Sequence, residues 1–422
     1  MPPLPPRPAS GLFYFILLFC AFVLLLCIIF TYCCRKRSKP ISIYQQVADK
    51  IAFPNSQLLE HKVFTENIVK KLLNKMQELS VVGDPDISSD IIQTGSAFED
   101  LKVIPQIEFD FLIPISVPSP YLSTCEFDID DIPNAFGKIC ISKDESGFSF
   151  EQTARYRKPG NFLEKMCNDH YLSSKAVREW FQSLADRAAN VFKGDERLVF
   201  KQQGPARTLK IIRNGNPTIS VDLVPAIKND NVYLVAKIYG GQFEMDHCKD
   251  VLWRLSFSVQ EKAFLEQKDL TLPKNACHKR ALQILKYLKQ EERNSETPPP
   301  HWCTSLSSYH LKTLWLHQLH KTPASQWVNI LLRERVIELL NHLIHSLESK
   351  TLHHFFMGNA ELIKEASSLH IPTRFLKDGL KYNLYDEIHY ETMNQAVLQL
   401  KKLKKHIDLN MENILSKPSA KC

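Results

Sequence analysis

The sequence predicts an α+β protein in which a mixed sheet precedes a helical C-terminal half, with one transmembrane helix in front of both. Three observations predict this: an N-terminal apolar run of 21 residues, short β-branched and aromatic segments in the middle, and helical periodicity after residue 278. The 422 residues suffice for two or three cores. We divide them into an extracytosolic N-terminus (1–11), a transmembrane helix (12–34), a basic juxtamembrane linker (35–60), a core lobe (61–245) and a helical lobe (246–415).

Composition excludes several classes of protein. Hydrophobic residues make up 44% of the chain and charged residues 23%, which is ordinary for a globular protein and argues against disorder or a collagen-like repeat. No G-x-G-x-x-G or G-x-x-x-x-G-K-[ST] motif occurs. The glycine-rich loops of Rossmann and P-loop proteins are therefore absent from the sequence.

The apolar run explains the expected membrane anchor. A helix over residues 12–32 spans about 30 Å, the thickness of a bilayer core, whereas a cleaved signal peptide has a shorter apolar region and a buried core helix rarely lacks a polar face over this length. The positive-inside rule places the N-terminus outside and the rest in the cytosol. The long apolar run favours the endoplasmic reticulum or plasma membrane over the mitochondrial outer membrane. The basic residues that set this orientation are Arg35, Lys36, Arg37 and Lys39 after the run, against Arg7 before it.

Charge and cysteine content point to a cytosolic main domain. The first 40 residues contain five basic and no acidic residues, so the rest of the chain has a formal net charge of only +2 out of +7. A net charge of +2 gives only weak support for nucleic-acid binding. The 11 cysteines form no C-x-x-C pair, as is typical of reduced cytosolic thiols. Cys33 and Cys34 could be palmitoylated, or they could simply fill the membrane edge.

The soluble part alternates between the two types of secondary structure. Apolar residues at helical spacing predict an amphipathic helix over residues 63–79 and another over 174–192. Strands are expected in the segments IEFDFLIPI, FGKICIS, RLVF, TLKIIR, TISVDLVPAI and VYLVAKI between residues 91 and 238. Helices follow from residue 278, with a break at the prolines 298–300.

The candidate chemistry begins with an acidic pair. Glu108 and Asp110 lie two residues apart on a predicted strand, so both carboxylates point to one face. Paired carboxylates suit Mg²⁺ or Mn²⁺, which take oxygen ligands and share them with substrate phosphates. The alternative interpretation is the solvated face of an amphipathic strand.

Two further features favour the metal interpretation. Gly95 and Ser96, thirteen residues before the acidic pair, could hold a terminal phosphate through a backbone N–H and a hydroxyl. Asp222 supplies a third carboxylate on a later strand. This layout is typical of polymerase-β-type nucleotidyltransferases, in which metal ions align a triphosphate for in-line attack by a hydroxyl.

The chain resembles the Mab-twenty-one family of nucleotidyltransferase-fold proteins, and within it the cyclic GMP-AMP synthase-like receptors, over roughly residues 60–410. The resemblance implies a bilobed fold and the use of ATP and/or GTP with Mg²⁺. Five motifs in order carry it: TGSAFEDLKVIPQIEFDF at 94–111, SVDL at 220–223, WRLSFS at 253–258, LQILKYL at 282–288 and SSYHLKT at 307–313.

The resemblance also implies residue roles. The carboxylates Glu108, Asp110 and Asp222 would be catalytic and bind the metal. Tyr309 would stack on a base, although core packing is the alternative for Tyr309 and more so for Trp253. The nucleotide-binding positions would be Gly95, Ser96, Arg254, Ser256, Lys286, Ser308, Tyr309 and Lys312.

One departure concerns zinc. The DNA-sensing synthase of the family has a zinc loop with one His and three Cys, whereas residues 259–276 here contain neither residue type and Cys277 with His278 cannot complete four ligands. We therefore expect no bound zinc. The evidence for binding of double-stranded nucleic acid is then limited to runs of basic residues, and such runs are more often the solvated faces of helices. These runs are at Arg155, Arg157 and Lys158, at Lys279 and Arg280, and at Lys401, Lys402, Lys404 and Lys405.

Two functions remain open from the sequence. The first is a membrane-anchored enzyme that makes a cyclic dinucleotide or short oligonucleotide from ATP and/or GTP. The second is a catalytically silent nucleotide-binding scaffold that recruits protein partners at a membrane through its helical lobe.

Overall fold

The computed structural model describes residues 41–105, 107–127, 132–143, 162–203, 206–213, 215–237, 239 and 246–418. The predicted N-terminus (1–11), anchor (12–34) and cysteine pair lie outside these ranges, as do the basic residues at 155–158, so they stay predictions. Within the described ranges, no helix has the length and apolar character needed to cross a bilayer.

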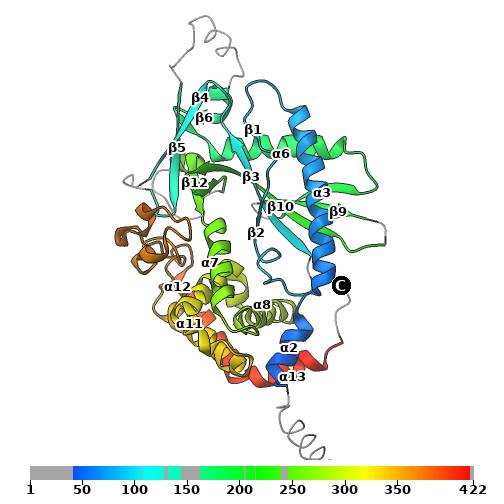
Figure 1. The fold of residues 1–422 in the computed structure, drawn as a ribbon, viewed down its shortest axis with the longest axis vertical. Coiled ribbons are helices and arrows are strands. Elements are labelled where there is room, and N and C mark those ends of the chain that lie inside the picture. Colours follow the sequence, from blue (N-terminus) through cyan, green and yellow to red (C-terminus); the bar gives the residue numbers. More distant parts are fainter. Residues whose placement is uncertain are drawn as a thin grey trace, which may run out of the picture.

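A mixed sheet forms one lobe of the molecule (Figure 1). In the described residues its main order is β1-β3-β10-β11-β12-β5-β7-β6, with β2 beside β3, β4 beside β5, and β8 and β9 continuing from β10. Strands β3 and β10 are parallel neighbours, and the other pairings are antiparallel. The strands are β1 (Asp86–Ile87), β2 (Ile92–Thr94), β3 (Glu108–Ser116), β4 (Tyr121–Glu126), β5 (Phe136–Lys143), β6 (Cys167–Asn168), β7 (Tyr171–Leu172), β8 (Arg197–Gln203), β9 (Ala206–Ile212), β10 (Ile219–Asn229), β11 (Val232–Val235) and β12 (Leu252–Ser256).

Period-two alternation builds the two central strands. Phe109 and Phe111 of β3 and Val221 of β10 are buried, while the polar residues between them face the other side of the sheet. On the buried face, α3 (Asn55–Leu79) packs against α6 (Ser174–Asn190). The predicted strands and the helix near 174–192 are confirmed.

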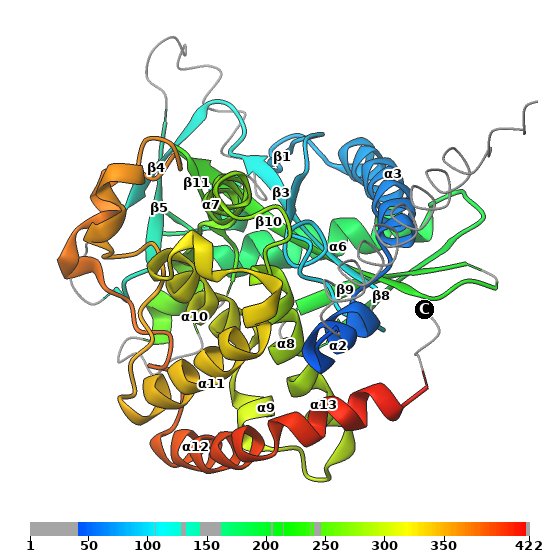
Figure 2. The same cartoon turned by 60° about the horizontal axis from the view of Figure 1, so that its bottom comes forward.

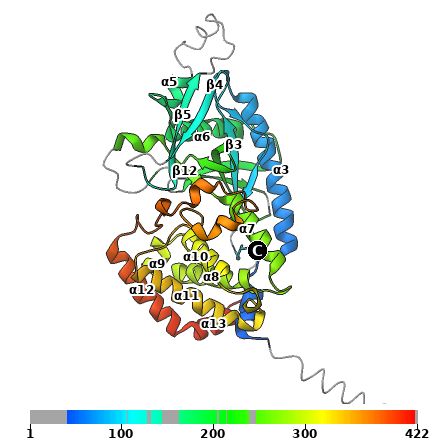
Figure 3. The same ribbon diagram turned by 60° about the vertical axis from the view of Figure 1, so that its left-hand side comes forward.

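Helices make up the second lobe, which lies below the sheet in Figure 3. Its break is confirmed, because α8 ends before the three prolines and α9 begins after them. The α-helices are α7 (Ser258–Thr271), α8 (His278–Ser295), α9 (His301–Ser305), α10 (Ser308–Lys321), α11 (Leu332–Glu348), α12 (Tyr390–Lys405) and α13 (Ile407–Ser416). Short 3₁₀ helices are η1 (Asp246–Val251), η2 (Ala324–Gln326), η3 (Asn329–Leu331), η4 (Ala360–Glu365), η5 (Thr373–Leu376) and η6 (Asp378–Leu380), and a one-turn α5 (Phe162–Met166) lies on the sheet lobe.

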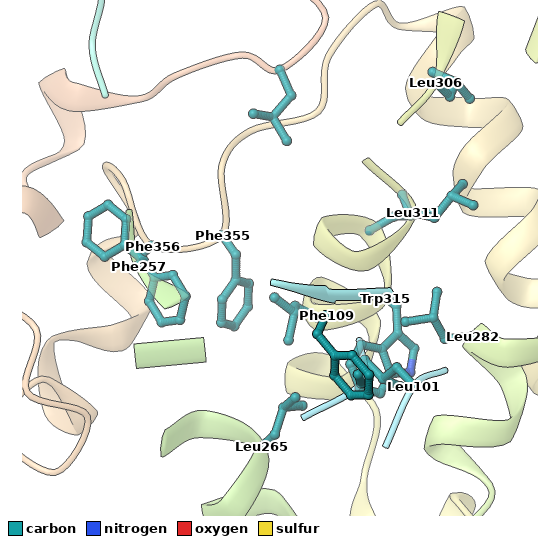
Figure 4. Close-up of a cluster of buried hydrophobic side chains, with 14 of the residues drawn as sticks. Leu101, Phe109, Phe257, Leu265, Leu282, Leu306, Leu311, Trp315, Phe355 and Phe356 are labelled. Carbon is teal, nitrogen blue, oxygen red and sulfur yellow. The ribbon is translucent and has the colours of Figure 1, made fainter. Parts of the chain in front are cut away.

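One hydrophobic core runs through both lobes. Figure 4 shows Leu101 and Phe109 from the sheet lobe close to Leu282 and Trp315 from the helical lobe. All four side chains are at most 1% exposed. Trp253 is fully buried as well, and its indole N–H donates to the Leu172 carbonyl at 2.9 Å, so core packing explains this residue.

One helix boundary and one linker assignment differ from the sequence prediction. Helix α3 begins at Asn55, eight residues before the predicted start at Val63, because Leu58 at its N-terminal end is buried. The stretch predicted as a linker carries a further helix, α2 (Ile43–Ile51), capped by Ser42. Tyr44, Val47 and other apolar residues of α2 are buried, and α2 packs against α13, α8 and α11 (Figure 2). A segment of nine residues is too short for the spacing of its apolar residues to predict a helix from the sequence.

Candidate functional site

The three carboxylates come together on one adjacent pair of strands. In the parallel pairing of β3 with β10, Asp110 lies directly opposite Asp222, and Glu108 lies opposite Ser220. Neighbouring strands are about 4.8 Å apart, so these side chains share one face at short range. The structure thus unites residues that are 112 positions apart in the sequence.

The glycine turn lies against the same site. Strand β2 pairs with β3 so that Thr94 faces Asp110, and the next residue, Gly95, turns the chain with φ +79°. A Cβ at this position would overlap Oδ2 of Asp110. Only glycine fits here, since both the backbone conformation and the carboxylate exclude a larger residue. Ser96 follows directly and is half-buried beside it.

Burial and like charge change the protonation of these carboxylates. Burial, followed by repulsion from Glu108 and Asp222, raises the pKa of Asp110 to about 7. Burial also raises the pKa of Asp222, against the opposing effect of the Thr208 hydroxyl, which donates to Oδ1 of Asp222 at 2.7 Å. Burial therefore disfavours the ionised forms of Asp110 and Asp222 more than the nearby lysines stabilise them.

Lys102 is a basic group within this cluster, and sequence reasoning missed it. Its ammonium group lies 3.5 Å from Oε2 of Glu108 and is almost fully buried. Burial lowers the pKa of Lys102, while Glu108, Asp110 and Asp222 oppose that effect. No local pattern could have identified this residue, because it lies in a loop and approaches the acidic pair only after folding.

The donor set fits a hard divalent cation. Three carboxylates on adjacent strands, one of them with a strongly raised pKa, are chemically suited to Mg²⁺ or Mn²⁺. Across the part of the chain that the structure describes, no three His, Cys, Asp or Glu side chains are already arranged around a common ion position. The metal-binding role of Glu108, Asp110 and Asp222 accordingly stays a prediction.

The helical lobe brings two predicted phosphate-binding lysines to the loop after the glycine turn. Lys312 of α10 lies 2.6 Å from Oε1 of Glu99 and 2.5 Å from Oε2 of Glu261. Lys286 of α8 donates to the Leu101 carbonyl at 3.0 Å, and burial lowers its pKa to about 8. Both lysines thus lie between the two lobes, but the ammonium group of each one already contacts oxygen atoms of the protein.

Tyr309 lies in the same region. Its hydroxyl donates to Oε1 of Glu261 at 3.0 Å and is 2.8 Å from Nε2 of His354, and the Arg254 guanidinium lies 5.6 Å from the ring centroid. The half-buried ring leaves both base stacking and core packing open. Of the remaining predicted positions, Ser308 is exposed at the first turn of α10 and Ser256 is bonded to the Ser258 hydroxyl at 3.2 Å.

Several of the other singled-out residues have structural partners. The Cys277 thiol donates to the Val328 carbonyl, and His278 lies 2.9 Å from Asp269, so neither side chain is directed toward a shared ion. Among the basic runs, Lys279 pairs with Asp100 and Asp269, Arg280 with Asp49, and Lys401 with Glu348.

Comparison with protein families identifies both lobes. Residues 97–267 match the Mab-21 protein nucleotidyltransferase domain, and residues 277–377 match the Mab-21 protein HhH/H2TH-like domain. The chain belongs to the Mab-21 family. The mixed sheet with its helical C-terminal region has the architecture expected of the nucleotidyltransferase fold in this family.

Individual Mab-21 family relatives carry two kinds of name. The inositol 1,4,5-trisphosphate receptor-interacting protein of Takifugu rubripes is 26% identical over 87% of this chain and 73% of its own length, and the human protein of that name is 27% identical over 82% and 69%. A cyclic GMP-AMP synthase-like receptor of Nicrophorus vespilloides is 26% identical over 58% of this chain and 68% of its own length.

Proposed function

We propose that this Mab-21 family chain is a membrane-anchored, cytosol-facing nucleotidyltransferase that makes a cyclic dinucleotide or short oligonucleotide from ATP and/or GTP. The register of β3 and β10, which sets Asp110 opposite Asp222 with the Gly95 turn beside them, supports this proposal. A protein that only binds a nucleotide has no need of three carboxylates on one face of two adjacent strands. The relative named as a synthase-like receptor supports the choice of reaction class.

The residues of the site have separable tasks. The turn at Gly95 and Ser96 would hold the triphosphate through a backbone N–H and a hydroxyl. Glu108, Asp110 and Asp222 would hold Mg²⁺ or Mn²⁺, which when bound neutralises phosphate charge. In the reaction a nucleotide hydroxyl oxygen bonds to the α-phosphorus, the bond to pyrophosphate breaks, and a carboxylate accepts the hydroxyl proton.

The test is turnover by the full chain. The chain is incubated with ATP, GTP and Mg²⁺ or Mn²⁺, with and without double-stranded RNA or DNA, and products are identified by mass spectrometry. We expect a new phosphodiester product that Asp110→Asn abolishes and that Asp195→Asn retains, because Asp195 is an exposed residue outside the site. A product that persists in Asp110→Asn would contradict the proposed site.

Metal binding provides a readout that is independent of turnover. Mg²⁺ should raise the thermal unfolding temperature of the wild-type chain by binding to the folded state, and it should have no such effect on Asp110→Asn. An equal rise in both proteins would place the metal elsewhere.

A second function is supported by the lysines of the helical lobe. Lys286 and Lys312 are bonded to a carbonyl and to two carboxylates, so phosphates would have to displace these contacts. Together with the relatives named for interaction with a receptor, this supports, as the alternative, a catalytically silent nucleotide-binding scaffold at a membrane. Nucleotide binding without any product, under every activator tried, would select the scaffold.

A further inference from the structure

The described chain begins beside the junction of α12 with α13. The Tyr44 hydroxyl of α2 donates to Oδ1 of Asp408 at 2.7 Å, and Asp408 is the second residue of α13. Arg333 of α11 fixes the same carboxylate through two bonds, at 2.6 and 3.0 Å. Figures 1 and 2 show α2 and α13 together at the end of the molecule that is opposite the sheet. The first described helix, α2, is therefore fixed at this junction.

The last turns of α12 carry a concentrated positive charge at the same place. We call Lys401, Lys402, Lys404 and Lys405 the junction patch; all four are exposed. Lys401 pairs with Glu348 at 2.7 Å. Burial raises the pKa of Glu292, and the charge of Lys402 opposes that effect. In the described part of the chain, Lys404 and Lys405 have no ion pair.

The surroundings of the junction patch are partly apolar. Leu398, one turn before Lys401 and Lys402 on α12, is 61% exposed, and Leu409 on α13 is 53% exposed. Lysines in the last turn of a helix interact favourably with the helix dipole, and this effect can explain why lysines occur here. It does not explain why the two leucines are exposed. Basic and apolar side chains together are the combination that inserts into a membrane interface.

The length of the connecting segment limits how far this surface can be from a bilayer. The predicted anchor ends at residue 34 and the described chain starts at Ile41. Residues 34 and 41 are seven steps apart in the chain, so they can be separated by at most about 25 Å when the chain between them is fully extended. Four of the residues between them are basic, which is the charge that an anionic membrane surface attracts.

We propose that the junction patch faces the bilayer and binds the headgroups of anionic phospholipids. This inference rests on the membrane anchorage in the proposed function and is independent of catalysis. Contact at this end directs the sheet lobe away from the membrane, since that lobe is at the far end of the molecule (Figure 3). The carboxylates on β3 and β10 thereby stay accessible to soluble nucleotides.

The test compares lysine labelling in two lipid environments. The full chain is reconstituted into nanodiscs of phosphatidylcholine, or of phosphatidylcholine with phosphatidylserine, and treated with an amine-reactive reagent that is quantified by mass spectrometry. Labelling of Lys404 and Lys405 should be about fivefold lower with phosphatidylserine, and high salt should restore it, as for basic side chains at an anionic surface. Lys165 of α5, which is exposed on the sheet lobe, should be labelled equally in both discs.

Paired variants test whether the patch itself is responsible. In Lys404→Glu/Lys405→Glu, the lipid dependence of labelling at Lys401 and Lys402 should disappear, whereas Lys165→Glu/Lys193→Glu, with the same change of charge on the sheet lobe, should keep it. Equal labelling of wild-type Lys404 and Lys405 in both discs would overturn the proposal, as would a chain that does not enter the discs. Protection of these lysines by duplex RNA but not by phosphatidylserine would reassign the patch to nucleic acid. Nucleotide turnover by wild type and Asp110→Asn is measured in a separate experiment. The test of lipid contact therefore does not depend on the test of catalysis, and the reverse also holds.

Discussion

The contact between Gly95 and Asp110 gives the sharpest prediction for a single residue. Alanine at position 95 should destabilise the fold and displace the carboxylate, since it adds a Cβ that would overlap Oδ2 at φ +79°. Gly215, with φ +74° and no atom within 4 Å of where a Cβ would lie, is the matched control. Its alanine variant should cost only the left-handed backbone strain of about 1–2 kcal/mol. Urea denaturation should show a larger loss for Gly95→Ala, and equal losses would show that the carboxylate contact is unimportant.

His354 predicts a pH dependence of stability. Burial, followed by the charge of Arg254, lowers the pKa of His354 to about 3, and its Nδ1 accepts from the backbone N–H groups of Phe356 and Met357. In the unfolded chain His354 becomes protonated below about pH 6.5, whereas in the folded protein it stays neutral until about pH 3. The free energy of unfolding therefore decreases as the pH falls through this window. Between pH 6.5 and 5 the loss due to this group should be about 2 kcal/mol.

The measurement is the free energy of unfolding of wild type and His354→Asn at both pH values. The variant should lose less stability on acidification, because asparagine does not titrate. His345→Asn, at an exposed position, should follow the wild type. If His354→Asn has the same pH slope as the wild type, the histidine is not held neutral by the fold.

At the scale of elements, Lys312 connects three segments. It lies on α10 between Glu261 of α7 and Glu99, which follows the glycine turn of the sheet lobe. Lys312→Met leaves two buried carboxylates without a counter-charge, which should cost about 3–5 kcal/mol. Urea denaturation measures this loss. The triple variant Lys312→Met/Glu99→Gln/Glu261→Gln, which buries no charge, should recover most of it, and failure to recover would mean that packing rather than charge holds α10.

At the scale of the whole molecule, the continuous core predicts that both lobes unfold together. Phe109 and Trp315 belong to one cluster of buried side chains that spans the lobes. Hydrogen exchange in increasing urea should therefore give the same free energy of opening for amides of β3 and β10 as for amides of α8 and α11. Exchange of the sheet amides at lower urea concentrations would show two independent domains.

The sequence by itself determined the local features of this protein. Period-two alternation identified β3 and β10, with Phe109 and Phe111 inside and Glu108 and Asp110 on the opposite face. Helical spacing and the three prolines identified the second lobe and its break. These features are predictable because each depends on residues within a few positions of one another.

Only the tertiary structure decided which distant groups meet. The register of β3 with β10 sets Asp222 opposite Asp110, Lys102 enters the carboxylate cluster from a loop, and Lys312 is shared by two carboxylates from different elements. Helix α2 likewise depends on α13, through the bond from Tyr44 to Asp408. Strand register and the pairing of buried charges follow from packing between segments that are far apart in the chain, and local periodicity carries no information about that packing.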